Sequence, residues 1–452
     1  MFKRILKYLN DGNARTRQIK KNIAASFFLK GINVVISFLL VSVTLNYLNP
    51  MKYGIWLTLS SILGWVYFFD LGLGNGLRNK FAEAVANNDR ELARKYISTT
   101  YVVVFIITII FYLFFLVINP LLDWSFILNT GHELRIELSV LACIVFTFFI
   151  LRFIFGLINV ILIADQKPAL SDAINVLSNF FILLIVYILT KISTAGSLLL
   201  LGSILSVIPV IVLVAFSVFF YWGKYKDYRP SIKYVDMKHF YELGSLGIQF
   251  FIIQMAVLVV FQTNNIIIAQ MFGPAEVTPY NIAYKYFLIA TLIFNIIITP
   301  FWSAYTEAYI RNDFIWIKRI TNKLIRIWGV IVALVILMVI FSNIFYKIWI
   351  GNLVRIPILL TIFMGVFVLI SAWNNIFVFF INGIGKIRIQ LYCGVIIALI
   401  NVPMAIFFAK NLSLGIAGVI LGSCFSLFIG AIAIPIQYYK IINKTASGIW
   451  LR

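Results

Sequence analysis

The stretch Tyr101–Ile118, YVVVFIITIIFYLFFLVI, decides the fold class. It contains no charged side chain, and its neighbours extend the apolar run to about residues 97–122. A helix of about 20 mostly apolar residues is long enough to cross the hydrocarbon core of a bilayer. The sequence therefore predicts a membrane-spanning helix here.

The composition of the whole chain agrees with a membrane protein. Of 452 residues, 62% are hydrophobic and 12% are charged, and the mean hydropathy is +1.00. Soluble domains are about 45–50% apolar and about 25% charged. A soluble fold of this length has too little interior for so much apolar surface, so lipid must solvate much of it.

Eleven further apolar runs predict helices of the same kind, which makes an all-α polytopic protein of about twelve membrane spans. Their approximate bounds are 23–48, 53–73, 138–163, 170–190, 197–221, 244–270, 280–305, 324–347, 356–382, 389–410 and 414–439. The first run is too long for the hydrophobic part of a cleavable signal peptide. The outer loops between these spans are short, so no catalytic domain is expected outside the membrane.

The basic residues predict the orientation of the spans. With a cytoplasmic N-terminus and alternating spans, the inner segments hold 28 of the 37 Lys and Arg residues, the outer segments hold 6, and three lie within spans. Cytoplasmic loops carry such an excess, so both termini are predicted to be cytoplasmic. The same rule explains the net charge of +21 without a nucleic-acid partner.

An internal repeat divides the chain into two six-helix lobes. Glu83–Asp89 and Glu307–Asp313 match at an offset of 224 residues, as do Pro50 and Pro274. Six spans per repeat predict a pseudo-two-fold axis along the membrane normal, with a cavity between the lobes that opens to alternate sides. The expected organisation comprises a cytoplasmic amphipathic lead-in (1–22), an N-lobe (23–221), a cytoplasmic linker (222–243), a C-lobe (244–440) and a cytoplasmic tail (441–452).

Charged residues within predicted spans are candidate binding groups, because charge in a bilayer is costly. Arg152 lies midway along its span, and its planar guanidinium suits a pyrophosphate; the alternative is a structural pair with a carboxylate. Lys30 and Lys285 are further candidates, although each side chain can instead extend to the membrane surface.

Uncharged polar residues predict the lining of a hydrated cavity. Asn175 and Asn179 are four residues apart and share one helix face. The alternative role for each amide is a hydrogen bond between helices. The complete set of lining candidates is Asp70, Arg78, Asn175, Asn179, Gln254, Gln262, Asn264, Asn265 and Asn374.

Several kinds of chemistry are not expected. His132 and His239 lie far apart in the sequence, so no metal site is predicted, and the three cysteines lie in apolar runs. The glycines at 72, 74 and 76 follow an apolar helix and are followed by Leu77, which is unlike a nucleotide-binding fingerprint. No cofactor and no direct use of ATP are expected. An ion gradient, the membrane potential or substrate consumption would drive transport.

The segment from Tyr53 to Arg78 resembles polysaccharide-export flippases of the Wzx type, which are related to the MATE exporters and the lipid II flippases. The residues that carry the resemblance are YGIW at 53–56 and FDLGLGNGLR at 69–78, together with the loop Glu83–Lys95 and the twelve-span plan. The resemblance implies a flippase of the bacterial inner membrane that is not an enzyme. It would move undecaprenyl-pyrophosphate-linked oligosaccharides, as for O-antigen, lipopolysaccharide or capsule, from the cytoplasmic to the periplasmic leaflet.

This resemblance implies a basic central cavity, where Arg152 and Lys30 would bind the pyrophosphate, with help from Lys285. The polymerase and chain-length proteins of a glycan pathway would be partners, and coupling to H⁺ or Na⁺ stays open. One alternative is a MATE-like cation or drug antiporter, which requires acids facing the cavity. Others are a membrane glycosyltransferase or polymerase, which requires a sizeable loop with paired acids, and a scaffold without transport.

Overall fold

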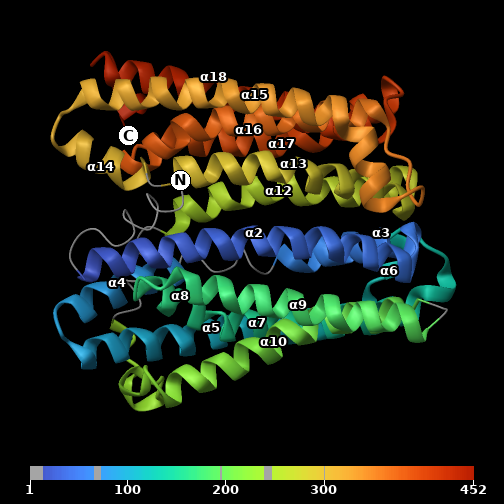
Figure 1. Ribbon diagram of the computed structural model, residues 1–452, viewed down its shortest axis with the longest axis horizontal. Coiled ribbons are helices and arrows are strands. Elements are labelled where there is room, and N and C mark those ends of the chain that lie inside the picture. The colour runs from blue at the N-terminus through green and yellow to red at the C-terminus, as the bar shows by residue number, and fades with distance from the viewer. Residues whose placement is uncertain (1–13, 66–72, 194–195, 239–246, 300, 452) are drawn as a thin grey trace. The chain divides into compact units, whose positions relative to one another are not determined.

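The computed structural model describes residues 14–65, 73–193, 196–238, 247–299 and 301–451, and every regular element in those ranges is a helix (Figure 1). Ten of these helices are long and apolar enough to cross a membrane, and Leu258–Phe272 is a shorter apolar helix. The predicted all-α, multi-pass membrane fold is therefore confirmed. The number of twelve spans and the two-fold axis stay predictions, since the expected span 53–73 falls partly outside the described residues.

The chain packs into two compact units. Unit 1 comprises Met1–Asn49, Leu63–Phe126 and Gly131–Phe251, and unit 2 comprises Pro50–Ile62, Ile127–Thr130 and Ile252–Arg452. These units contain most of the two predicted lobes. Two short segments of the N-terminal half nevertheless belong to unit 2, so the lobe boundaries predicted from the sequence stay predictions.

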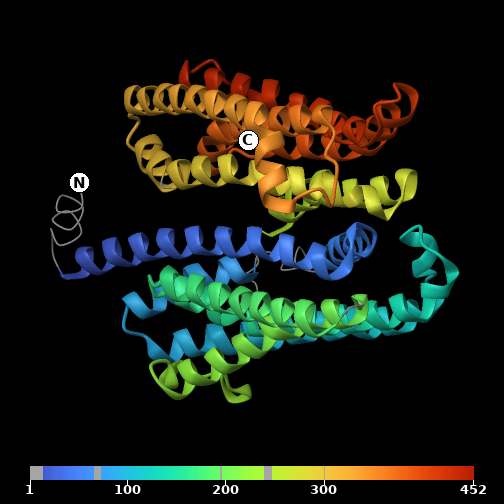
Figure 2. The ribbon, with the colours of Figure 1, turned by 45° about the vertical axis from the view of Figure 1, so that its right-hand side comes forward.

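Unit 1 is a helical bundle in which α2 runs along α9, while α10 packs against α7 and α9 (Figure 2). The helices are α2 (Ala14–Leu48), α4 (Leu73–Ala86), α5 (Arg90–Ile118), α6 (Trp124–Ile127, whose last residue belongs to unit 2), α7 (Arg135–Phe155), α8 (Leu157–Ala164), α9 (Pro168–Ile192) and α10 (Leu198–Trp222). Buried side chains such as Phe81, Ile161 and Leu213 fill its core. The chain bends at Gly156 between α7 and α8, one turn beyond Arg152.

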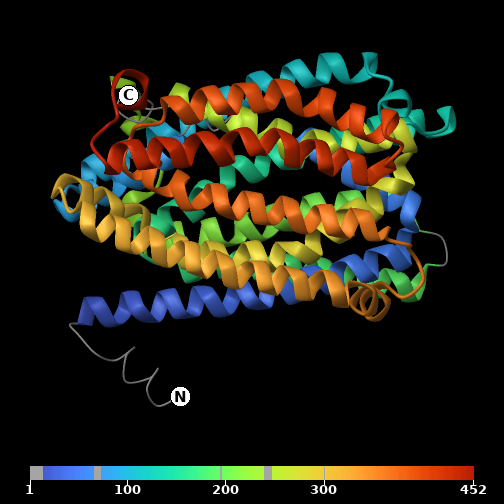
Figure 3. The same cartoon turned by 90° about the horizontal axis from the view of Figure 1, so that it is seen from above.

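Unit 2 is built around α16, α17 and α18, whose ribbons run side by side (Figure 3). The helices are α3 (Pro50–Leu63, whose last residue belongs to unit 1), α12 (Gly247–Phe272, whose first five residues belong to unit 1), α13 (Val277–Ile298), α14 (Phe301–Ile310), α15 (Phe314–Ile350), α16 (Ile358–Ile384), α17 (Arg388–Ile406) and α18 (Gly415–Ile442). Phe377, Phe380 and Tyr438 are buried in its core. Val330 and Ile348 on α15 are exposed despite being apolar, as expected for a surface that faces lipid.

The helix α3 is fastened to unit 2 by close backbone contact. A Cβ atom added at Gly54 would lie 1.7 Å from the Pro274 carbonyl oxygen, so only glycine allows this approach. The Thr278 hydroxyl donates a hydrogen bond of 2.6 Å to the Pro50 carbonyl. Nearby, the Gln270 side chain donates to the Ile127 carbonyl over 2.6 Å. The two segments of the N-terminal half that belong to unit 2, Pro50–Ile62 and Ile127–Thr130, are thus held by specific hydrogen bonds.

The repeated segments found in the sequence have the same local structure. Asn88 and Asn312 both have φ of 57°, a left-handed conformation that asparagine tolerates. The residue that follows each one, Asp89 or Asp313, caps the next helix through a side-chain hydrogen bond of 2.9 Å. A shared turn and a shared cap at equivalent places support an origin by duplication.

The basic linker after α10 is attached to unit 1. Arg90 on α5 forms a 2.9 Å ion pair with Asp227, and the Arg94 side chain donates to the Arg229 carbonyl. The Arg94 guanidinium also lies 4.1 Å from the centre of the Tyr234 ring. The linker through residue 238 therefore packs as part of unit 1, and the rest of the predicted linker, 239–243, lies outside the described residues.

Candidate functional site

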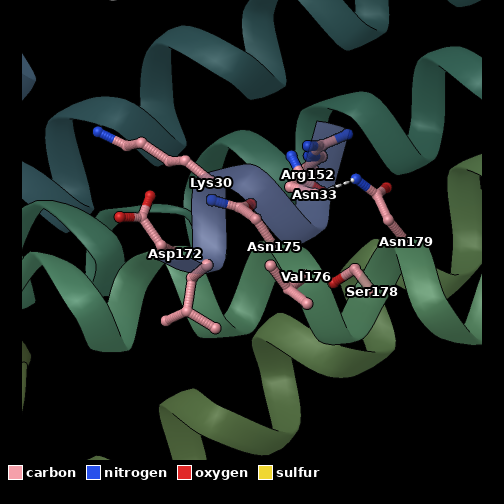
Figure 4. Close-up of a pocket in the computed structure, with 9 residues that line it drawn as sticks. Lys30, Asn33, Arg152, Asp172, Asn175, Val176, Ser178 and Asn179 are labelled. Atoms are coloured by element: carbon pink, nitrogen blue, oxygen red, sulfur yellow. Dashed lines mark hydrogen bonds between the residues drawn. The ribbon is translucent and has the colours of Figure 1, made fainter. Parts of the chain in front are cut away.

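A polar cavity of about 310 Å³ lies among α2, α7 and α9 of unit 1. It brings together Lys30 from α2, Arg152 from α7, and Asn175 and Asn179 from α9 (Figure 4). These four residues were candidates from the sequence, although they come from three helices far apart in the chain. The polar cavity expected from the sequence lay between two lobes, whereas this one lies within a single unit.

The two cations in this cavity differ in their surroundings. Arg152 is half-buried near the end of α7 and interacts with other groups of the protein. Lys30 is exposed, and its ammonium makes no hydrogen bond or ion pair with any residue in the described ranges. The cavity therefore presents a lysine whose charge is available to a ligand and, toward its other end, an arginine that already interacts with other groups of the protein.

Asp172 is a lining residue that the sequence analysis missed. It lies on α9 and its carboxylate accepts a hydrogen bond from the Ser26 hydroxyl of α2. In Figure 4, Asp172 and Lys30 lie at one end of the group, while Arg152 and Asn179 lie at the other. Asp172 precedes Asn175 by three residues and Asn179 by seven, a spacing that places all three on one helix face. That spacing was the available signal.

Hydrogen bonds fix the polar lining of the cavity. The Asn179 amide donates to the side-chain oxygen of Asn33 over 2.7 Å, which joins α9 to α2. Asn175 donates to the Ser171 carbonyl over 3.2 Å, and the Ser178 hydroxyl donates to the Ile174 carbonyl. With two cations and one carboxylate, the lining carries an excess of positive charge and suits an anionic ligand.

A second cavity, of about 340 Å³, lies among the helices of unit 2. Asn374 from α16 is part of its lining, together with Asn375, Gln390 and several aromatic and aliphatic side chains. The Asn374 amide donates to the Leu427 carbonyl of α18 over 3.3 Å. No acidic or basic side chain occurs among the described residues that line this cavity, so its character is neutral.

The remaining candidates lie elsewhere. Lys285 on α13 of unit 2 lines neither cavity and makes no hydrogen bond or ion pair with the part of the chain that is described. Arg78 is exposed on α4, and Gln262 is half-buried on α12. Asp70 and the side chain of Gln254 lie outside the described residues.

Two of the predicted lining amides hold helices together. The Asn264 amide is fully buried and donates to the Tyr280 hydroxyl over 2.9 Å and to the Ser423 hydroxyl over 3.0 Å. The side-chain oxygen of Asn265 accepts from Asn281 over 2.8 Å. These bonds correspond to the alternative role considered for such amides, which is bonding between helices.

Solved structures with the same overall fold are transporters. An inward-facing MATE family multidrug resistance transporter of the MOP superfamily superimposes with a TM-score of 0.69 at 15% identity, covering 93% of this chain and 100% of that one. An outward-facing structure of a MATE family transporter gives a TM-score of 0.63 at 16% identity, covering 97% and 98%. At this level of identity the superpositions show that this chain shares the fold of these membrane proteins.

Sequence comparison identifies the family. Residues 19–305 match the model of the polysaccharide biosynthesis protein family, and this chain belongs to that family. A Yersinia pseudotuberculosis protein named for O-antigen export is 23% identical over 79% of this chain and 81% of its own length. A Salmonella typhimurium protein named for O-antigen transport is 23% identical over 93% and 97%. The resemblance to Wzx-type flippases predicted from the sequence is therefore confirmed.

Proposed function

We propose that this transporter is a flippase for an anionic, lipid-linked oligosaccharide. The substrate would be an undecaprenyl-pyrophosphate-linked glycan unit that moves from the cytoplasmic to the periplasmic leaflet of the bacterial inner membrane. The names of the two bacterial relatives and the family description support a glycan substrate. The charge of the cavity in unit 1 supports a substrate with a diphosphate.

The observation that carries the proposal is the pairing of Lys30 and Arg152 in one cavity of unit 1. Holding a charged side chain inside a bilayer costs about 2.5–3.5 kcal/mol at the centre of a helix. A diphosphate in a medium of low dielectric is also costly unless cations and hydrogen-bond donors compensate it. The two cations and the bound diphosphate would each offset the cost of holding the other in the membrane, which accounts for two cations in this cavity.

Each of the lining side chains would contribute a different interaction to binding. The Arg152 guanidinium offers a planar set of N–H donors that matches two phosphate oxygens at once, whereas the Lys30 ammonium acts as a compact charge. The amides of Asn175 and Asn179 supply further polar contacts at the cavity wall. The prenyl chain would stay in lipid, where the exposed apolar side chains of the helices already lie.

Transport would follow alternating access, with both termini in the cytoplasm. The excess of Lys and Arg in the predicted inner segments supports this orientation. Relatives of the fold are known in inward-facing and outward-facing structures, which supports two states for this chain as well. The driving force would be an ion gradient, the membrane potential or consumption of the substrate.

A MATE-like cation or drug antiporter is the second candidate. Asp172 favours it, because a carboxylate in a membrane cavity can attract a cation. The two basic residues that line the same cavity disfavour it, since they would repel a cationic cargo. The family match and the names of the relatives also favour the glycan substrate over a drug.

Complementation tests the proposal. The gene would be deleted in its own host, and surface glycan would be measured after return of wild type, Arg152→Ala, Arg152→Lys or Lys30→Ala. We expect Arg152→Ala to lower glycan display at least tenfold, and Arg152→Lys to retain an intermediate level because it keeps the charge and loses the fork. Lys30→Ala should also lower display.

Lys347→Ala is the matched control, since Lys347 is exposed in the last turn of α15 and lines neither cavity. It should display glycan like wild type. All variants would be compared at equal abundance in the membrane. Full display by a variant lacking both Lys30 and Arg152 would refute the diphosphate role. Loss of drug resistance with unchanged glycan would favour the antiporter.

A further inference from the structure

The cavity of unit 2 contains three polar oxygen atoms that lack a partner. The side-chain oxygens of Ser371, Asn374 and Gln390 are buried, and none has a hydrogen-bond partner among the described residues. All three residues line the cavity, and Asn374 is only 9% exposed. Buried polar groups are almost always hydrogen-bonded, so three unpaired oxygens around one space point to a ligand.

The chemistry of these atoms defines what they can bind. An amide oxygen accepts hydrogen bonds, and a serine hydroxyl both donates and accepts. The ligand must therefore supply O–H or N–H donors. A metal ion or an ammonium group would prefer carboxylates, and none occurs among the described lining residues. A neutral ligand rich in hydroxyl groups fits this set best.

The rest of the lining suits the flat faces of a sugar ring. Phe261 and Phe367 form an edge-to-face pair with ring centroids 5.3 Å apart, and Tyr284 also lines the cavity. A pyranose presents C–H groups on its faces and hydroxyl groups around its edge, so aromatic rings and amides can contact different parts of it. The volume of about 340 Å³ lies at the lower end of small-molecule sites, which are about 300–1,000 Å³.

We propose that the cavity of unit 2 is a binding site for one uncharged sugar ring, held by Ser371, Asn374 and Gln390 and packed against Phe261 and Phe367. This assignment of the sugar subsite rests on the proposed function for its role in transport, since the glycan part of the substrate would be its natural occupant. The recognition itself requires no charge and no lipid.

Saturation-transfer NMR on the full chain in lipid nanodiscs tests the site. The probes are the methyl glycosides of glucose, galactose and N-acetylglucosamine at millimolar concentration. We expect transfer to at least one glycoside, and competition between that glycoside and its free sugar. Gln390→Leu should lower the transferred signal at least fivefold. Absence of transfer to all three glycosides would overturn the proposal.

A glycine substitution provides a variant with a matched control. A Cβ atom at Gly430 would meet the Asn374 side chain at 3.4 Å, an ordinary contact, so the larger side chain of Gly430→Leu would occupy the cavity. Gly329→Leu is the control, because a Cβ atom at Gly329 on α15 meets nothing within 4 Å. Signal that is lost only in Gly430→Leu supports the site, and equal signal in both variants refutes it.

The diphosphate role of the unit 1 cavity and the sugar site of the unit 2 cavity can be refuted independently of each other. Arg152→Ala should leave glycoside binding unchanged, because Arg152 belongs to the cavity of unit 1. Glycoside binding in a chain that exports glycan normally without Arg152 would keep this inference and refute the diphosphate role. No glycoside binding in a chain that depends on Arg152 would do the reverse.

Discussion

The cavities of the two units differ in charge, although the two halves of the chain share a repeated sequence segment with the same turn. The unit 1 cavity contains Lys30, Arg152 and Asp172, whereas the described lining of the unit 2 cavity is made of amides, hydroxyls, aromatic rings and aliphatic groups. Charge within a bilayer is costly, so each charged side chain in a cavity needs a compensating role. The difference teaches that a turn and a cap shared by the two halves do not require the same side-chain chemistry in the two cavities.

The strongest test of this difference exchanges the charge between the units. Asn375 lies as far from the start of α16 as Arg152 lies from the start of α7. We expect the double variant Arg152→Asn with Asn375→Arg to lose at least about 30-fold in glycan export. Removing one partner of a buried charged contact costs about 2–5 kcal/mol, and the new arginine lies in the wrong unit.

Surface glycan at equal membrane abundance measures this effect, and Asn375→Arg alone is the control for insertion of the new charge. Recovery of export in the double variant would show that the two cavities are interchangeable. In that case the contrast between a charged unit and a neutral unit would have no functional meaning.

A smaller effect on ligand binding is expected from the Asp172 carboxylate in the unit 1 cavity. Asp172→Asn removes a negative charge from the cavity, so binding of inorganic pyrophosphate to the purified chain should tighten about tenfold, the order expected for one charge at close range in a partly hydrated site. Asn175→Asp adds a negative charge to the same helix face and should weaken binding by a similar factor. Calorimetry measures both, and equal affinity in the two variants would contradict the site.

The smallest expected effect is the response to salt. Between about 50 and 300 mM salt, screening should weaken pyrophosphate binding about threefold. Glycoside binding to unit 2 should change little, because no charged side chain lines the described part of that cavity. Titrations at both concentrations measure the two responses. Parallel salt dependence for the two ligands would remove the distinction between the cavities.

Much of the fold could be predicted from the sequence because the signals are local. Apolar runs of span length predicted the helices, and the match of Glu83–Asp89 with Glu307–Asp313 identified the two segments that the structure shows with the same turn and cap before α5 and α15. The position of α3 in unit 2 could not be predicted. It depends on the close approach of Gly54 to Pro274, which are 220 residues apart in the chain.

The candidate sites were predictable in part. Lys30 and Arg152 could be identified because a charged side chain within a membrane span is energetically costly. Helical spacing predicted that Asn175 and Asn179 share one helix face. Asp172 was missed because it stands near the first turn of α9, where an acid is unremarkable in sequence. The unpaired oxygens of Ser371 and Gln390 were also beyond prediction, because an amide or hydroxyl that joins helices looks the same in sequence as one that lines a cavity.

Two segments of the N-terminal half, Pro50–Ile62 and Ile127–Thr130, belong to unit 2, and this has a consequence for a chain that is divided between its two halves. Gly54 and Thr278 fasten α3 onto unit 2, and Gln270 fastens Ile127. If the gene were split so that one polypeptide ends at residue 238 and a second begins at residue 239, both polypeptides would contribute residues to unit 2. Co-expressed fragments should find each other in the membrane, because the C-terminal piece needs residues from its counterpart to complete its own packing.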